Sequence, residues 1–153
     1  MTPDLIMGLD PGMSGGVAFL TFDGEVVGVY PMPETEHEAK DLIAEFAPRI
    51  AKAAIERLQP MQLTSKVTMF KLGRSYGFLR GILTVLQVPF DEVQPKAWQH
   101  GIGCIYPSKA KHSQRKAVNR QKAQQMFSRI PFRIDDKTAD ALLIAEHCRR
   151  TYR

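Results

Sequence analysis

Three short apolar segments near the N-terminus, joined by tight turns, constrain the fold of this 153-residue chain more than any other feature. They span residues 5–9, 17–22 and 25–30, and each has the length of a β-strand. The Asp-Gly pair at positions 23 and 24 is a strong hairpin signal between the second and third segments. The pattern predicts an antiparallel meander of three strands.

After this meander, helical periodicity alternates with two further strand-like segments. The remaining predicted elements are, in chain order, a helix over 36–47, a strand over 51–55, a loop over 57–68, a helix over 69–86, a strand over 88–93, a helical turn over 95–100, a polar loop over 101–116, and helices over 117–128 and 138–150. A meander followed by crossovers predicts an α/β fold with a five-stranded mixed sheet flanked by helices.

Size and composition fit one globular domain over residues 1–153, with 44% hydrophobic and 24% charged residues. No apolar run approaches the roughly 20 residues of a membrane span, and the N-terminus has no signal-peptide pattern, so we expect no membrane partner. The two cysteines, Cys104 and Cys148, lie outside any Cys/His cluster, which disfavours zinc and disulfide scaffolds. A reducing cytoplasm is therefore the expected location.

Charge is unevenly distributed along the chain. Residues 1–56 carry 10 acids and 3 bases, whereas residues 57–134 carry 14 bases and 2 acids. A long basic segment is typical of proteins that bind a polyanion, because each Lys or Arg near a phosphate releases counterions. The alternative is a solvated surface that keeps the protein soluble.

Three carboxylates occupy positions where charge is costly. Asp10 follows an apolar strand, Glu56 ends an alanine-rich strand, and Asp140 lies among apolar residues of the last helix. Each has a structural alternative: a turn residue at Asp10, an ion pair with Arg57 at Glu56, and an exposed or dipole-stabilised position at Asp140. If the three converge, they repel one another unless a divalent cation such as Mg²⁺ or Mn²⁺ is bound.

A fourth carboxylate is expected just before the last helix. Asp136 lies four residues before Asp140, so the two share a face if both are helical. We favour Asp136 over Asp135 for this reason, although either can instead be the helix N-cap.

Four segments together resemble the RuvC-like Holliday junction resolvases, with the short phage-encoded members closest in length. They are GLDPGMSGG at 8–16, AAIE at 53–56, KLGRSYGFLRGIL at 71–83 and DDKTADALLIAEH at 135–147. The resemblance spans residues 5–147 and implies the ribonuclease H-like fold in a DNA-associated protein of a bacterial or phage-infected cell.

The resemblance also implies a site with two Mg²⁺ ions, for which Mn²⁺ can substitute. Asp10 would bridge both ions, Glu56 would hold one and orient water, and Asp140 would be a ligand from the last helix. Many bacterial members have an acid or a histidine three residues before this last aspartate, where this chain has Lys137. The fourth ligand must then be Asp136 or Asp135, or be missing.

The implied activity is paired phosphodiester hydrolysis on a four-way DNA junction by a homodimer, leaving 5′-phosphate and 3′-hydroxyl ends. A lysine, either Lys109 or Lys116, is expected to steady the scissile phosphate, and Gln62 and Met61 occupy positions of junction-opening contacts in the family. The candidate DNA-binding residues are Lys66, Lys71, Arg74, Lys109, Lys111, Arg115 and Lys116.

Gly73, Gly77 and Gly81 form a flat stripe on one helix, which indicates close packing against either the sheet or a second subunit. Three other functions compete with the junction nuclease. An actin-like ATPase would need two domains of this kind. A DNA-binding module with a decayed nuclease centre, and a nuclease for flaps, forks or RNA–DNA hybrids, stay as alternatives.

Overall fold

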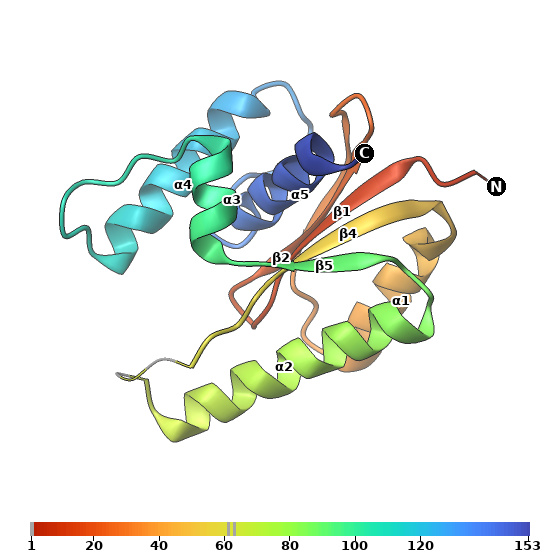
Figure 1. The fold of residues 1–153 in the computed structure, drawn as a ribbon, viewed down its shortest axis with the longest axis horizontal. Helices are drawn as coiled ribbons and strands as arrows, with labels where there is room; N and C mark the ends of the chain where they lie inside the picture. Colours follow the sequence, from red (N-terminus) through yellow and green to blue (C-terminus); the bar gives the residue numbers. More distant parts are fainter. Residues whose placement is uncertain (1, 61, 63) are drawn as a thin grey trace.

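The predicted five-stranded mixed sheet is present in the computed structural model, which describes residues 2–60, 62 and 64–153 (Figure 1). Its strand order is β3-β2-β1-β4-β5. The meander strands pair antiparallel, whereas β4 is parallel to both β1 and β5. The strands are β1 (Leu5–Asp10), β2 (Gly16–Thr21), β3 (Val26–Pro31), β4 (Ile50–Glu56) and β5 (Phe90–Val93).

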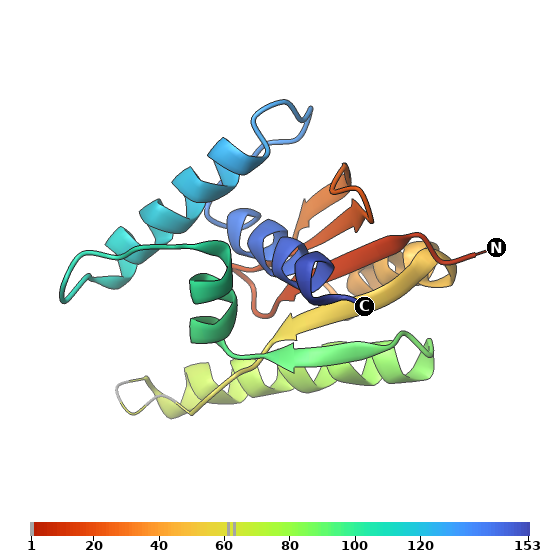
Figure 2. The ribbon, with the colours of Figure 1, turned by 45° about the horizontal axis from the view of Figure 1, so that its top comes forward.

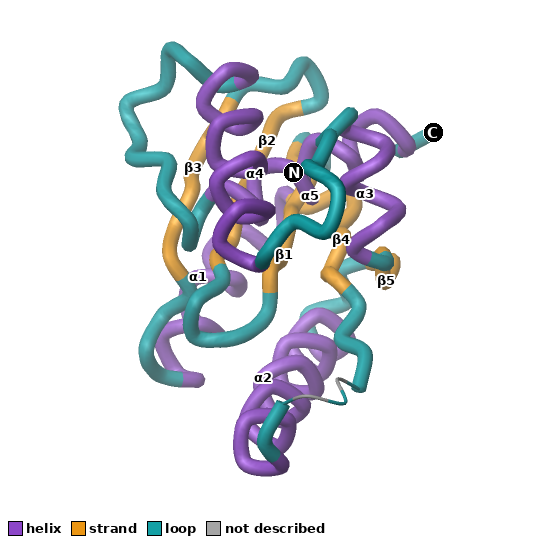
Figure 3. Tube along the Cα trace, turned by 90° about the vertical axis from the view of Figure 1, so that its left-hand side faces the viewer, coloured by secondary structure: helices purple, strands orange, loops and turns teal. Residues whose placement is uncertain are grey.

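Helices cover both faces of this sheet, as Figures 2 and 3 show from two further directions. One face carries α1 (Glu36–Phe46) and α2 (Lys66–Val85), with a short 3-10 turn (Ala47–Arg49) before β4. The other carries α3 (Pro95–Ile102), α4 (His112–Met126) and α5 (Ala139–Thr151). Among the described residues, none of these helices is both long and apolar enough to cross a membrane.

Strand alternation decides which side chains face the α5 side of the sheet. In β1, Met7 packs in the apolar cluster beneath α1 and α2, whereas Ile6 packs in the cluster beneath α5. Because successive side chains point to opposite faces, Asp10 also faces the α5 side. In β4, Ala54 packs beneath α5, and the same alternation places Glu56 on that face.

Gly8 lets α5 pack directly onto β1. A methyl group at Gly8 would overlap backbone atoms of Ala141 and Ala145 in α5. The absence of a side chain therefore brings the start of α5, which carries Asp140, close to the end of β1.

Three helix starts and four strand starts differ from the predicted boundaries, and the largest differences are at α4, α2 and β5. Helix α2 begins at residue 66 rather than 69, because the Ser65 side chain accepts a hydrogen bond from the Thr68 amide at 3.1 Å. Helix α4 begins at 112 rather than 117, and the Gln114 side chain accepts from the Lys111 amide at 2.8 Å. Strand β5 begins at 90 rather than 88, and α5 begins at 139.

Candidate active site

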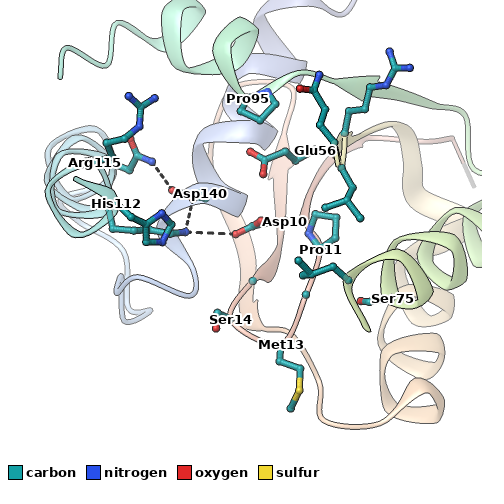
Figure 4. A pocket seen from close by; sticks show the side chains of 18 of the residues that line it. Asp10, Pro11, Met13, Ser14, Glu56, Ser75, Pro95, His112, Arg115 and Asp140 are labelled. Atoms are coloured by element: carbon teal, nitrogen blue, oxygen red, sulfur yellow. Dashed lines mark hydrogen bonds and ion pairs between the residues drawn. The ribbon is translucent and has the colours of Figure 1, made fainter. Parts of the chain in front are cut away.

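A cavity of about 660 Å³ opens at the carboxyl ends of β1 and β4 (Figure 4). Asp10, Glu56 and Asp140 all line it. Residues of α2, α3 and α4 also line it, including Lys71 from α2 and Lys116 from α4. The structure therefore brings together the three carboxylates that the sequence singled out.

Parallel pairing explains how residues 46 positions apart become neighbours. Leu9 of β1 is in register with Ile55 of β4, so the next residue on each strand is a carboxylate at the same edge of the sheet. Asp140 lies in the first turn of α5 and points into the same cavity in Figure 4. Asp10 is 8% exposed and Asp140 6%, so both are largely removed from bulk water.

Burial and mutual repulsion make the charged form of two of these acids costly. Burial raises the pKa of Asp10 well above its usual value, and the neighbouring Glu56 and Asp140 raise it further. Burial also raises the pKa of Glu56, although a hydrogen bond from Trp98 opposes this shift. Both acids are therefore harder to ionise than free carboxyl groups, and a bound cation would favour their ionised form.

Lys116 and Asn119 of α4 hold the carboxylate of Asp140. Lys116 Nζ lies 2.6 Å from Oδ2 of Asp140 and 4.0 Å from Oδ2 of Asp10. Asn119 Nδ2 donates to the other oxygen of Asp140 at 2.9 Å. Burial lowers the pKa of the Lys116 ammonium, but Asp140 and Asp10 outweigh it and keep that pKa above its usual value.

Two further contacts orient the site, and sequence reasoning missed both. Trp98 is fully buried and its Nε1 donates to Oε2 of Glu56 at 2.6 Å. The hydroxyl of Tyr106 donates to Oδ1 of Asn119 at 2.5 Å, which fixes the amide so that its nitrogen faces Asp140. The only sequence signals were a lone tryptophan and an asparagine three residues after Lys116 in a polar segment.

The helical argument for Asp136 as a fourth carboxylate is wrong. It required Asp136 and Asp140 to share a helix face, but α5 begins at Ala139. Asp136 does not line the cavity; its carboxylate pairs with Arg120 at 2.6 Å. Asp135 is also outside the cavity and accepts a hydrogen bond from the Lys137 amide at 3.0 Å.

Carboxylate oxygens are the hard ligands that Mg²⁺ and Mn²⁺ prefer, and Asp10 and Glu56 each present oxygen to the cavity. Within the described part of the chain, however, no three Asp, Glu, His or Cys side chains converge closely enough to ligate one ion. Both oxygens of Asp140 are engaged by Lys116 and Asn119. Asp10 and Glu56 are therefore the two cavity carboxylates without a hydrogen bond from α4, and they are the residues that would hold an ion.

The predicted DNA-binding residues divide between the cavity and its surroundings. Lys71, Arg115 and Lys116 line the cavity, although the Arg115 guanidinium donates to Gln99 at 3.0 Å and stacks 4.0 Å from the Tyr106 ring centre. Four others lie outside the lining: Lys66 and Arg74 on α2, and Lys109 and Lys111 before α4. Gln62 is exposed, and Met61 lies outside the described residues.

The glycine stripe of α2 faces open space. A methyl group added at Gly73, Gly77 or Gly81 would meet no other described side chain or backbone within 4 Å. Packing of this stripe against the sheet, one of the two predicted alternatives, is therefore wrong. Exposed apolar side chains accompany it, with Val67 65% and Phe70 70% exposed.

Comparison with solved structures identifies the fold. The chain is similar to T. thermophilus RuvC in complex with Holliday junction substrate, with 16% identity, a TM-score of 0.64, and coverage of 97% of this chain and 96% of that one. A second structure, Thermus thermophilus RuvC, matches at 19% identity and a TM-score of 0.55, covering 95% of each chain. No family model and no curated protein matches the sequence. The expected RuvC-like, ribonuclease H-like fold is thereby confirmed.

Proposed function

We propose that this chain is a metal-dependent endodeoxyribonuclease, one domain over residues 1–153, that cuts four-way junctions or other branched DNA. One observation carries the proposal: Asp10, Glu56 and Asp140 end or begin three separate elements and meet in one cavity with basic residues in its walls. The similar T. thermophilus protein binds a Holliday junction substrate, which supports branched DNA as the substrate class.

The proposed reaction is hydrolysis of a phosphodiester. The oxygen of water forms a bond to phosphorus and the bond to the 3′ oxygen breaks, which leaves a 5′-phosphate and a 3′-hydroxyl. A divalent ion, Mg²⁺ or Mn²⁺, would supply positive charge for the developing oxyanions and lower the pKa of a bound water. Asp10 and Glu56 would hold that ion, while Lys116 presents its ammonium between Asp10 and Asp140, where a scissile phosphate can be contacted.

The proposed DNA path runs between helix α2 and the segment before α4, both of which extend beyond the sheet edge (Figure 1). Lys66, Lys71 and Arg74 supply positive charge along the α2 side. Lys109 and Lys111 supply it on the opposite side. These side chains would bind phosphates of the arms and leave the chemistry to the carboxylates.

A homodimer through α2 would place a second site on the opposed strand. The open stripe of Gly73, Gly77 and Gly81 and the neighbouring Phe70 provide a flat, partly apolar helix face. A second copy fits this face because two such stripes allow close helix contact.

Sedimentation tests this interface. Gly77→Glu should give a monomeric mass, whereas Arg129→Glu, which lies far from α2, is the control and should stay dimeric. A dimeric Gly77→Glu would contradict this interface.

The decisive test compares cleavage of a labelled four-way junction and a linear duplex in Mg²⁺. We expect symmetric nicks on the junction alone. Asp10→Asn should retain junction binding and lose cleavage by about three orders of magnitude, which is a loss of roughly 4 kcal/mol of transition-state stabilisation. Asp136→Asn is the matched control and should cleave normally, because its partner is Arg120 outside the cavity.

Two results would reject this function. Junction binding by the wild-type chain without any Mg²⁺- or Mn²⁺-dependent cut would leave only a binding module. Equal cleavage by wild type and Asp10→Asn would show that the carboxylate cluster does not perform the reaction.

A further inference from the structure

Both carboxylate oxygens of Asp140 already have a partner from α4. One oxygen accepts from Asn119 at 2.9 Å, and the other is 2.6 Å from the Lys116 ammonium. Asn119 is itself fixed by the hydroxyl of Tyr106 at 2.5 Å, so the amide nitrogen is held toward Asp140. These contacts lie in a largely buried setting, where Asn119 is 3% and Asp140 6% exposed.

The ammonium of Lys116 stands between two of the three carboxylates. It contacts Asp140 directly and lies 4.0 Å from Asp10, with 23% of the lysine side chain exposed. Lys116 and Asn119 are three residues apart on α4 and therefore project from the same face of the helix. One helix face thus delivers both groups that engage Asp140.

Four cations line the cavity beside the three acids, namely Arg57, Lys71, Arg115 and Lys116. The Arg115 guanidinium is directed to Gln99 and the Tyr106 ring. Among the described residues, the ion pairs to Asp10 and Asp140 come from Lys116. Lys116 is therefore the cation placed to supply positive charge between these two acids.

We propose that Lys116 occupies the place of a second metal ion, so that each site binds one divalent ion through Asp10 and Glu56. Asp140 then acts as a positioning residue that holds Lys116, and Asn119 and Tyr106 hold Asp140. This inference rests on the proposed nuclease function and departs from the two-ion arrangement that the family resemblance implies.

The test counts Mn²⁺ ions bound to the full-length chain by electron paramagnetic resonance, without DNA. Wild type should bind one ion per chain. Lys116→Met keeps the apolar stem and removes the charge, and it should bind a second ion or bind the first at least 10-fold more tightly. Lys122→Met, a matched control on α4 outside the cavity, should behave as wild type.

Either of two results overturns the inference. One is a wild-type count of two ions or of none, which decides the matter even if Lys116→Met fails to fold. The other is a folded Lys116→Met that binds no more ions, and no more tightly, than Lys122→Met.

The junction assay separates this inference from the proposed function. One bound ion in wild type, a gain in Lys116→Met and no junction cleavage would reject the nuclease and support the ion count. Junction cleavage with two ions bound in wild type would support the nuclease and reject the role given to Lys116.

Discussion

At the scale of single residues, the carboxylate cluster opposes the stability of the fold. Asp10 and Asp140 are nearly buried, and Glu56 lies in the same cavity. The cation Lys116 offsets only part of this charge, since it contacts Asp140 at 2.6 Å but Asp10 at 4.0 Å. Such groups persist where function requires them, and substituting them often stabilises a protein.

Asp10→Asn should therefore stabilise the metal-free protein at neutral pH by about 0.5–2 kcal/mol. The folded-state pKa of Asp10 is raised by burial, then by Glu56 and Asp140, so ionisation costs more in the folded than in the unfolded state. This cost is absent below the unfolded pKa near 4 and grows as pH rises through the raised folded pKa. Urea unfolding in EDTA from pH 3 to pH 7 checks it; a gain that does not depend on pH would contradict the electrostatic cause.

Trp98→Phe should slow junction cleavage by about 10–100-fold, because it removes the 2.6 Å hydrogen bond that orients Glu56. The indole N–H favours the ionised carboxylate, so its loss raises the pKa of Glu56 further. The acid limb of the pH–rate profile should then move to higher pH, whereas a packing defect alone would lower the rate without moving it. An unshifted limb in a folded variant would contradict this role.

Asp10, Glu56 and Asp140 could be predicted from sequence because each lies at the end of an apolar segment or within one. A charged side chain at such a position is costly unless it has a partner, and this cost indicates a function. Trp98, Tyr106 and Asn119 could not, since their roles depend on side-chain directions set by tertiary packing. The helical argument for Asp136 failed because a four-residue spacing places two residues on one face only inside a helix, and α5 begins three residues after Asp136.

At the scale of elements, contact between β1 and α5 builds the site. Ile6 and Leu143 share one apolar cluster, and Gly8 removes the side chain that would hold the helix away. The strands were predictable from alternation and turn signals. The start of α4 was not, because residues 112–116 are polar and show no apolar periodicity, yet this extra turn places Lys116 in the cavity.

Gly8→Ala should destabilise the protein by about 1–3 kcal/mol, because the added methyl group overlaps the backbone of Ala141 and Ala145. Moving α5 also moves Asp140, so cleavage should fall in molecules that remain folded. Thermal unfolding and single-turnover cleavage measure the two effects. Gly73→Ala is the control for unfolding, since space is open there and alanine favours a helix; equal stability of the two variants would contradict the close packing.

At the scale of the whole molecule, the cavity opens where two basic segments extend past the sheet. The α2 segment with Lys66 and Lys71 and the segment with Lys109 and Lys111 come from the stretch of sequence that holds most of the positive charge. The acidic N-terminal third supplies β1 to β4, and with them Asp10 and Glu56. Charge segregation in the sequence thus becomes a spatial separation between basic surfaces and the acids of the cavity.

The double variant Lys109→Gln/Lys111→Gln should weaken junction binding and flatten its dependence on salt. Each lost phosphate contact lowers the slope of log affinity against log salt by about 0.9, so the expected change approaches about 1.8. Arg129→Gln/Arg133→Gln removes the same charge beyond the far end of α4 and should leave the slope nearly unchanged. Because both variants have the same net charge, only the position of the lost charges can separate them. Identical slopes would mean that Lys109 and Lys111 belong to a solvated surface and do not bind DNA phosphates. Helix α2 would then be the remaining candidate for the DNA-binding side.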